Sequence, residues 1–154
     1  MAVIENSVII SRPPEEVFDA LADPRSELRW NPDVASMEML TDGPIAPGSR
    51  YRAKWKGSPV VTLVITEVDR PRSWAYFNDG PIAVNLSISL TPEAGGTLLR
   101  SRFEARANGW FKLIFPLFVI MLRRTEKKTV QYAKQYVESR PAASAGSDSF
   151  SPRR

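Results

Sequence analysis

The middle of the chain alternates apolar and polar residues over six consecutive segments, each bounded by turn-forming residues. Residues 82–90 read IAVNLSISL, so isoleucine, valine or leucine occupies every second position. Successive side chains of a strand point to opposite faces of a sheet. The six segments therefore predict an antiparallel meander with one packed face and one solvated face. They are residues 36–41, 49–56, 60–68, 73–78, 82–90 and 97–106.

One long helical pattern follows this meander. Residues 109–139 repeat apolar side chains at three- and four-residue steps and would extend about 46 Å as a single helix. Because the meander needs a cover for its apolar face, we expect this helix to lie against it. Pro116 has no N–H to donate, so we expect a kink or break near it. The predicted stripe consists of Phe111, Phe115, Phe118, Leu122, Val130, Ala133 and Val137.

The N-terminal third predicts a strand and two short helices. Residues 3–11 are rich in β-branched side chains, which favour a strand. Pro13, Pro14 and two glutamates then suit the first turn of a helix that ends before Pro24. Residues 25–30 predict a second short helix. We expect one domain over residues 1–140 and, because residues 141–154 are small and polar, a disordered tail after it.

Composition excludes several kinds of chemistry. The 154 residues contain no histidine and no cysteine, so a Ser-His-Asp triad, a thiol nucleophile and a cysteine metal site are excluded. We expect no catalytic constellation, no metal and no cofactor. A net charge of +4 is too small to predict nucleic-acid binding. The first residues lack the basic start of a signal peptide, which makes the cytoplasm the default location.

Several short motifs, in order, carry a resemblance to a known family. These are PEEVFDALADP at 14–24, RWNPDV at 29–34, TEVDRPRSW at 66–74, GGT at 95–97 and a proline at 116. Over residues 2–139 the sequence resembles the polyketide cyclase/dehydrase and lipid-transport family of the START-like superfamily, which includes the birch-pollen-allergen proteins. The resemblance implies an α+β helix-grip fold, in which a curved antiparallel sheet of about seven strands wraps around a long C-terminal helix. The superfamily includes lipid and hormone carriers, aromatic polyketide cyclases and partner-binding modules.

The resemblance also implies a cavity between the sheet and the helix. The strand phases place a set of mostly aromatic and aliphatic side chains on its wall, with Trp30 at an entrance. The same side chains would serve equally in a filled core without a ligand. No two carboxylates are expected on this face. The predicted ligand-binding residues are Trp30, Tyr51, Trp55, Leu63, Ile65, Trp74, Tyr76, Asn78, Leu86, Ile88, Leu99, Ser101, Phe103, Phe115, Phe118 and Leu122.

Three hypotheses about function remain open from the sequence. The first is a binder of a small hydrophobic molecule such as a lipid, an isoprenoid or a polyketide. The second is an enzyme of the cyclase or dehydratase type, using Asn78, Tyr76 and Tyr51. The third is an interaction module acting through residues 110–124, where an apolar run precedes four basic residues. That run of thirteen residues is about 20 Å long as a helix, too short to span a hydrocarbon core of about 30 Å. It predicts contact with the short helices, a homodimer or a membrane surface.

Overall fold

Seven strands form one antiparallel sheet in the computed structural model, which describes residues 1–141. The order across the sheet is β1-β7-β6-β5-β4-β3-β2. All six segments predicted for the meander are strands, and their ends shift by a few residues. Apart from Pro141, the predicted tail lies outside the described residues. The strands are β1 (Ala2–Ile10), β2 (Val34–Met39), β3 (Arg50–Trp55), β4 (Val61–Asp69), β5 (Ser73–Asp79), β6 (Ile82–Glu93) and β7 (Gly96–Ala107).

Prolines stand in the first turn of several helices, as the sequence predicts for the first of them. Pro14 opens α1 (Pro14–Leu21), and Pro24 opens the short 3₁₀ helix η1 (Pro24–Ser26), which leads into α2 (Glu27–Trp30). The predicted kink or break near Pro116 takes the form of a break. The chain forms a separate 3₁₀ helix, η2 (Gly109–Leu113), and Pro116 occupies the first turn of α3 (Phe115–Ser139). A missing N–H costs nothing there, because first-turn N–H groups have no partner inside a helix.

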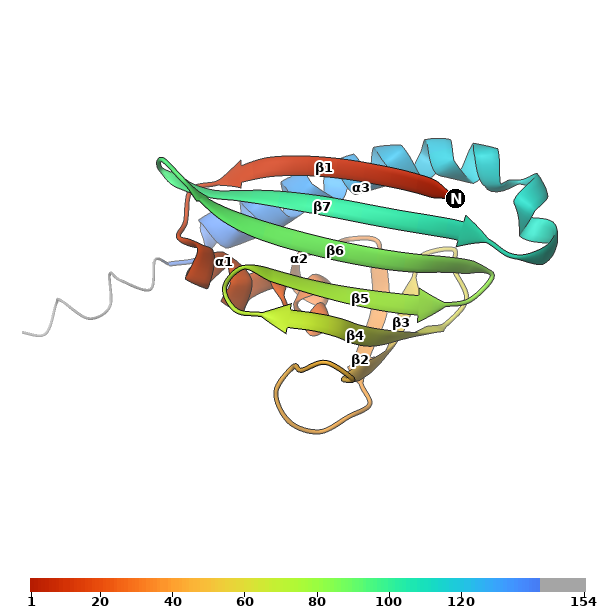
Figure 1. The fold of residues 1–154 in the computed structure, drawn as a ribbon, viewed down its shortest axis with the longest axis horizontal. Coiled ribbons are helices and arrows are strands. Elements are labelled where there is room, and N and C mark those ends of the chain that lie inside the picture. The colour runs from red at the N-terminus through yellow and green to blue at the C-terminus, as the bar shows by residue number, and fades with distance from the viewer. Residues whose placement is uncertain (142–154) are drawn as a thin grey trace, which may run out of the picture.

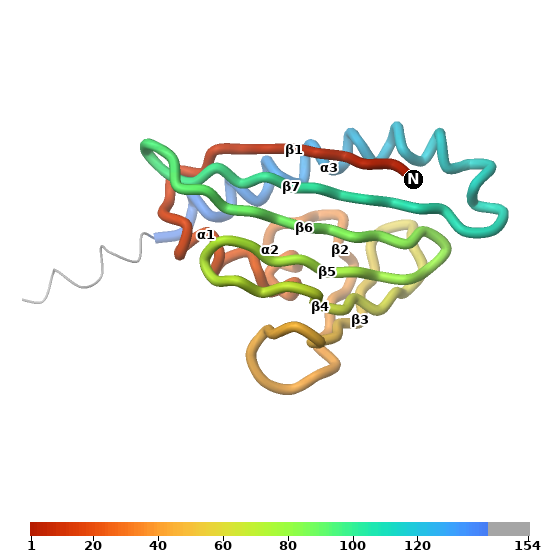
Figure 2. Tube along the Cα trace, in the orientation of Figure 1, coloured from red at the N-terminus to blue at the C-terminus, as the bar shows by residue number. Residues whose placement is uncertain are grey.

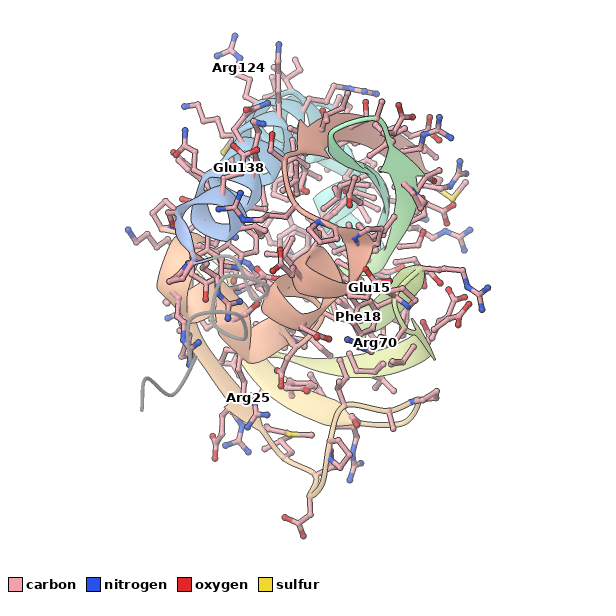
Figure 3. The ribbon with its side chains drawn as sticks, turned by 90° about the vertical axis from the view of Figure 1, so that its left-hand side faces the viewer. Glu15, Phe18, Arg25, Arg70, Arg124 and Glu138 are labelled. Atoms are coloured by element: carbon pink, nitrogen blue, oxygen red, sulfur yellow. The ribbon has the colours of Figure 1, made fainter. Side chains whose placement is uncertain are left out.

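The sheet curves around the helices, as the helix-grip fold requires. In Figure 1, α3 runs behind β1 and β7, and α1 and α2 lie behind the middle strands. Figure 3, viewed along the strands, shows the sheet bending around α1 and α3. The register of β4 against β5 shifts between Ile65 and Glu67, and such a bulge increases strand bending. The predicted helix-grip fold is confirmed.

The two ends of α3 are held very differently. At its C-terminal end, the Arg12 guanidinium donates to the carbonyl oxygens of Glu138 (2.7 Å) and Arg140 (3.0 Å). Lys134 Nζ donates to the Ile9 carbonyl oxygen at 2.6 Å, and the Ser11 N–H donates to the Glu138 carboxylate at 2.8 Å. The N-terminal end leaves large apolar side chains exposed. The trace in Figure 2 shows η2 and the start of α3 at the opposite end of the molecule from α1.

Three buried clusters make up the core, and the largest lies below α1. In it Phe18 meets Trp74 edge to face with ring centroids 5.5 Å apart, and Val130, Ala133 and Val137 of α3 pack nearby. A second cluster lies on the inner face of β2 to β5 around Tyr51 and Leu63. The third is small and joins β1, β7 and the start of α3. Between these clusters the interior is not filled by side chains.

Candidate functional site

A cavity of about 650 Å³ lies between the inner face of the sheet, the short helices and α3. Its walls come from α2, from β3 to β7 and from α3, and most of its side chains are apolar. Most of the residues predicted to bind a ligand line it, and binding itself stays a prediction. These residues are Trp30, Trp55, Trp74, Tyr76, Asn78, Leu86, Ile88, Leu99, Ser101, Phe103, Phe118 and Leu122.

The remaining predicted residues do not line the cavity. Tyr51, Leu63 and Ile65 point to the same side of the sheet, but they are at most 1% exposed within the second cluster, under Met37 and neighbouring apolar side chains. The alternation along a strand predicts on which face of the sheet a side chain lies. It does not predict whether that part of the face is packed or borders a cavity. Burial, and then the charge of Asp23, raises the pKa of Tyr51 to about 12. Phe115 packs in the third cluster and stacks on Phe118 with centroids 6.4 Å apart.

Among the described residues, three carboxylates line the cavity, contrary to the sequence expectation: Glu27, Asp33 and Glu126. Glu27 of α2 is 9% exposed and accepts a hydrogen bond of 3.2 Å from Asn31 Nδ2. Burial raises the pKa of Glu27 to about 7. Glu126 of α3 is half-buried, and burial, followed by the charges of Glu27 and Asp33, raises its pKa to about 8. A sequence signal for Glu126 existed, because it stands four residues after Leu122 and four before Val130 on the apolar stripe.

Two buried polar residues on the cavity wall, Tyr76 and Asn78, have no hydrogen-bond partner within the described chain or only a weak one. Tyr76 is 6% exposed, and within residues 1–141 its hydroxyl makes no hydrogen bond. Burial, and then the charges of Glu27 and Glu126, raises the pKa of Tyr76 well above its ordinary value. Asn78 Nδ2 donates to the Ile82 carbonyl oxygen at a long 3.4 Å. Buried polar groups usually find a partner in protein or water, so these are positioned to meet a molecule inside the cavity.

The cavity reaches the surface at η2 and the start of α3. Ile114 and Met121 line it and are also 43% and 57% exposed. Around this opening Trp110, Leu113 and Leu117 are 67%, 85% and 73% exposed. We call residues 110–121 the apolar tip.

A second hollow, of about 590 Å³, lies among polar and charged side chains of β1 and β4 to β7. Two of its charged groups, Glu5 and Arg102, pair with each other. Arg102 donates to Glu5 and to Glu104, each at 2.8 Å. This hollow therefore belongs to the solvated outer surface of the sheet. The candidate site is the apolar cavity.

The curved sheet and the long helix enclose an apolar cavity. This arrangement is typical of a class of folds that bind small molecules. Residues 1–138 match the family described as "Polyketide cyclase / dehydrase and lipid transport", and the chain belongs to that family. This confirms the resemblance drawn from the sequence motifs. No match was found among curated proteins.

Solved structures with the same fold are distant in sequence. Ara h 8.0201 is 18% identical, with a TM-score of 0.68 over 90% of this chain and 99% of that one. TTHA0849 from Thermus thermophilus is 17% identical, with a TM-score of 0.70 over 88% and 97%. The di-domain ARO/CYC BexL from the BE-7585A biosynthetic pathway is 17% identical, with a TM-score of 0.71 over 91% of this chain and 51% of that one. At such identities the likeness establishes the fold alone.

Proposed function

We propose that the chain binds a small, largely apolar molecule in the cavity between the sheet and α3. The observation that carries this proposal is the unfilled volume of about 650 Å³ with apolar walls and unbonded polar groups. Ligand sites of small molecules have volumes of roughly 300–1,000 Å³ and the same mixture of apolar walls and a few polar groups. Family membership supports the same role, because the family description includes lipid transport and polyketide cyclases.

Filling the cavity with a side chain is expected to abolish binding. Val84 lines the cavity from β6 and is half-buried, so a Val84→Trp indole would occupy ligand space. We expect the affinity for Nile red, a neutral apolar probe, to fall by at least about tenfold, which is about 1.4 kcal/mol. Fluorescence titration measures this. Native mass spectrometry of freshly purified wild type and Val84→Trp would in addition detect a co-purified ligand.

The neighbouring residue provides the matched control. Ala83 lies on the same strand and pairs with the exposed Arg106 on the outer face, so Ala83→Trp adds the same indole outside the cavity. It should leave probe affinity unchanged. Equal affinity in Val84→Trp and wild type, or no probe binding to either, would contradict the proposal.

An enzyme of the cyclase or dehydratase type would use the same cavity. Among the groups expected for it, Tyr76 and Asn78 line the cavity and Tyr51 does not. Glu27 and Glu126 are better placed to move protons, because their pKa values of about 7 and about 8 lie near neutrality. A carrier and an enzyme must both bind the ligand, and ligand binding is therefore the primary proposal.

A second candidate role is contact of the apolar tip with an anionic membrane surface. Leu117 and Met121 lie on one helical stripe with Arg124 and Lys128, which are exposed and make no ion pair within residues 1–141. Arg124 projects from the body of the molecule in Figure 3. Apolar side chains at the tip and cations about 10 Å further along suit insertion into lipid beneath anionic headgroups. No helix within the described part of the chain is long and apolar enough to cross a membrane.

Leu117→Glu is expected to remove this membrane contact. A carboxylate at the tip would have to enter hydrocarbon and would repel anionic headgroups. We expect flotation with phosphatidylserine-containing vesicles to fall at least about fivefold, which is about 1 kcal/mol. Gln131→Glu makes the same charge change at an exposed position on α3 and should float like wild type. Failure of the wild type to float would contradict the membrane role, and a dimer in sedimentation that Leu117→Glu dissociates would assign the tip to self-association instead.

A further inference from the structure

Three carboxylates line the apolar cavity, from α2, the turn after it and α3. The titratable groups that line it are Glu27 of α2, Asp33 after α2, Lys56 after β3, Tyr76 of β5 and Glu126 of α3. Lys56 is exposed, whereas Glu27 is buried and the other two carboxylates are half-buried. The interior field of the cavity is therefore negative whenever the carboxylates are ionised. An anionic headgroup, such as that of a fatty acid, is disfavoured in this environment.

Unpaired polar groups lie on the same cavity wall and provide an independent observation. Tyr76 is only 6% exposed, and its hydroxyl has no hydrogen-bond partner in the described part of the chain. Glu27 and Glu126 line the same cavity, and their charges contribute to the raised pKa of Tyr76. Ser101, at 4% exposure, likewise lines the cavity without a hydrogen bond there. Such groups are costly to bury unpaired and point to a ligand with complementary polar atoms.

The carboxylates are not arranged for a metal ion. Within residues 1–141, no group of three or more acidic side chains is placed to hold one. A cation that suits an apolar cavity lined by these carboxylates carries its charge on an organic group attached to a hydrophobic body. An ammonium group supplies N–H donors that two carboxylates and a hydroxyl oxygen can accept.

We propose that the cavity takes an amphipathic amine whose ammonium group donates to the carboxylates of Glu27 and Glu126 and to the hydroxyl oxygen of Tyr76. This inference rests on the proposed function and names the class of ligand. The raised pKa values of the two glutamates support it, because an empty acidic cavity holds protons that a bound cation would displace. Binding near pH 7 therefore releases protons from the protein.

A series of probes with one tail and three headgroups tests the inference. Dodecylamine, 1-dodecanol and dodecanoate are titrated by calorimetry below their micelle concentrations, at pH 6.5 and pH 8.5. At pH 8.5 we expect dodecylamine to bind at least about tenfold more tightly than dodecanol, and dodecanoate most weakly. The affinity for dodecylamine should rise between the two pH values, because the carboxylates ionise while an alkylamine, like lysine, stays protonated.

The Glu126→Gln variant tests whether the Glu126 carboxylate causes the preference for the amine. We expect it to lower dodecylamine affinity at least about tenfold at pH 8.5 and to leave dodecanol affinity unchanged. Glu93→Gln, at an exposed position in the β6–β7 hairpin, should change neither. Failure of all three probes to bind would remove the proposed function itself. Dodecanol binding as tightly as dodecylamine, or insensitivity of dodecylamine to Glu126→Gln, would overturn the amine assignment and leave apolar binding in place.

Discussion

Replacing Gly96 with alanine is expected to destabilise the fold by about 3 kcal/mol or more. Gly96 begins β7, and a Cβ built on it would overlap the backbone carbonyl of Ile10 and reach within 3.0 Å of Ser11 Cα. Its backbone is not in the left-handed region, so the cost is steric. The neighbouring backbone has little freedom to move, because Ile10 pairs with Thr97, and the Thr97 hydroxyl donates to the Arg12 carbonyl oxygen at 2.7 Å.

Urea unfolding measures this loss, and a second glycine provides the comparison. A Cβ on Gly80 would meet the Val61 side chain at 3.4 Å, an ordinary contact. Gly80→Ala should therefore change the free energy of unfolding by less than about 1 kcal/mol. Equal midpoints for Gly96→Ala and Gly80→Ala would show that the β1–β7 junction can open without cost.

Stability of the empty protein is expected to fall as pH rises from 5 to 9. Both Glu27 and Glu126 have folded-state pKa values, about 7 and about 8, above the ordinary value of 4.5. The folded state therefore holds protons that the unfolded state has released, and stability is greatest below pH 4.5 for these groups and is lost as pH rises through 7 to 8. Water in the open cavity screens Glu126, so we expect it to account for about 2 kcal/mol of this loss.

Glu126→Gln should remove that part of the pH dependence. A neutral amide cannot ionise, so the variant should equal wild type near pH 5 and exceed it by about 2 kcal/mol at pH 9. Urea unfolding of ligand-free protein at several pH values measures the difference. Parallel curves for the two proteins would mean that Glu126 is solvated like a surface residue. Saturation with a cationic ligand should reduce the loss in wild type, because the bound charge stabilises the ionised carboxylates.

Periodicity predicted the fold well because most of the sheet has one buried face. The strand over 82–90 and the stripe of Val130, Ala133 and Val137 both lie where their phases placed them. At Pro116 the expected break takes the form of a new helix start, because proline fits the first turn of a helix. The motifs added the connectivity, since they appear in the order that the family requires.

The cavity was predicted less completely, because a strand phase assigns a face and not the space above it. Tyr51 and Leu99 have equivalent patterns, yet only Leu99 borders empty space. Glu27 was missed because a four-residue helix is too short to show a buried side by periodicity. Glu126 was missed although it stands on the apolar stripe of α3, between Leu122 and Val130.

The pairing of β1 with β7 determines when the sheet can be completed during synthesis. Ala2 pairs with Ala105, so the first strand leaves the ribosome about one hundred residues before its only neighbour in the sheet. At translation rates of about 5–20 residues per second this delay is roughly 5–20 s. Throughout that interval the apolar side of β1 has no sheet to join, and we expect chaperones to bind it. Closure of the sheet and docking of α3 then follow almost together, once residues 96–139 have been made.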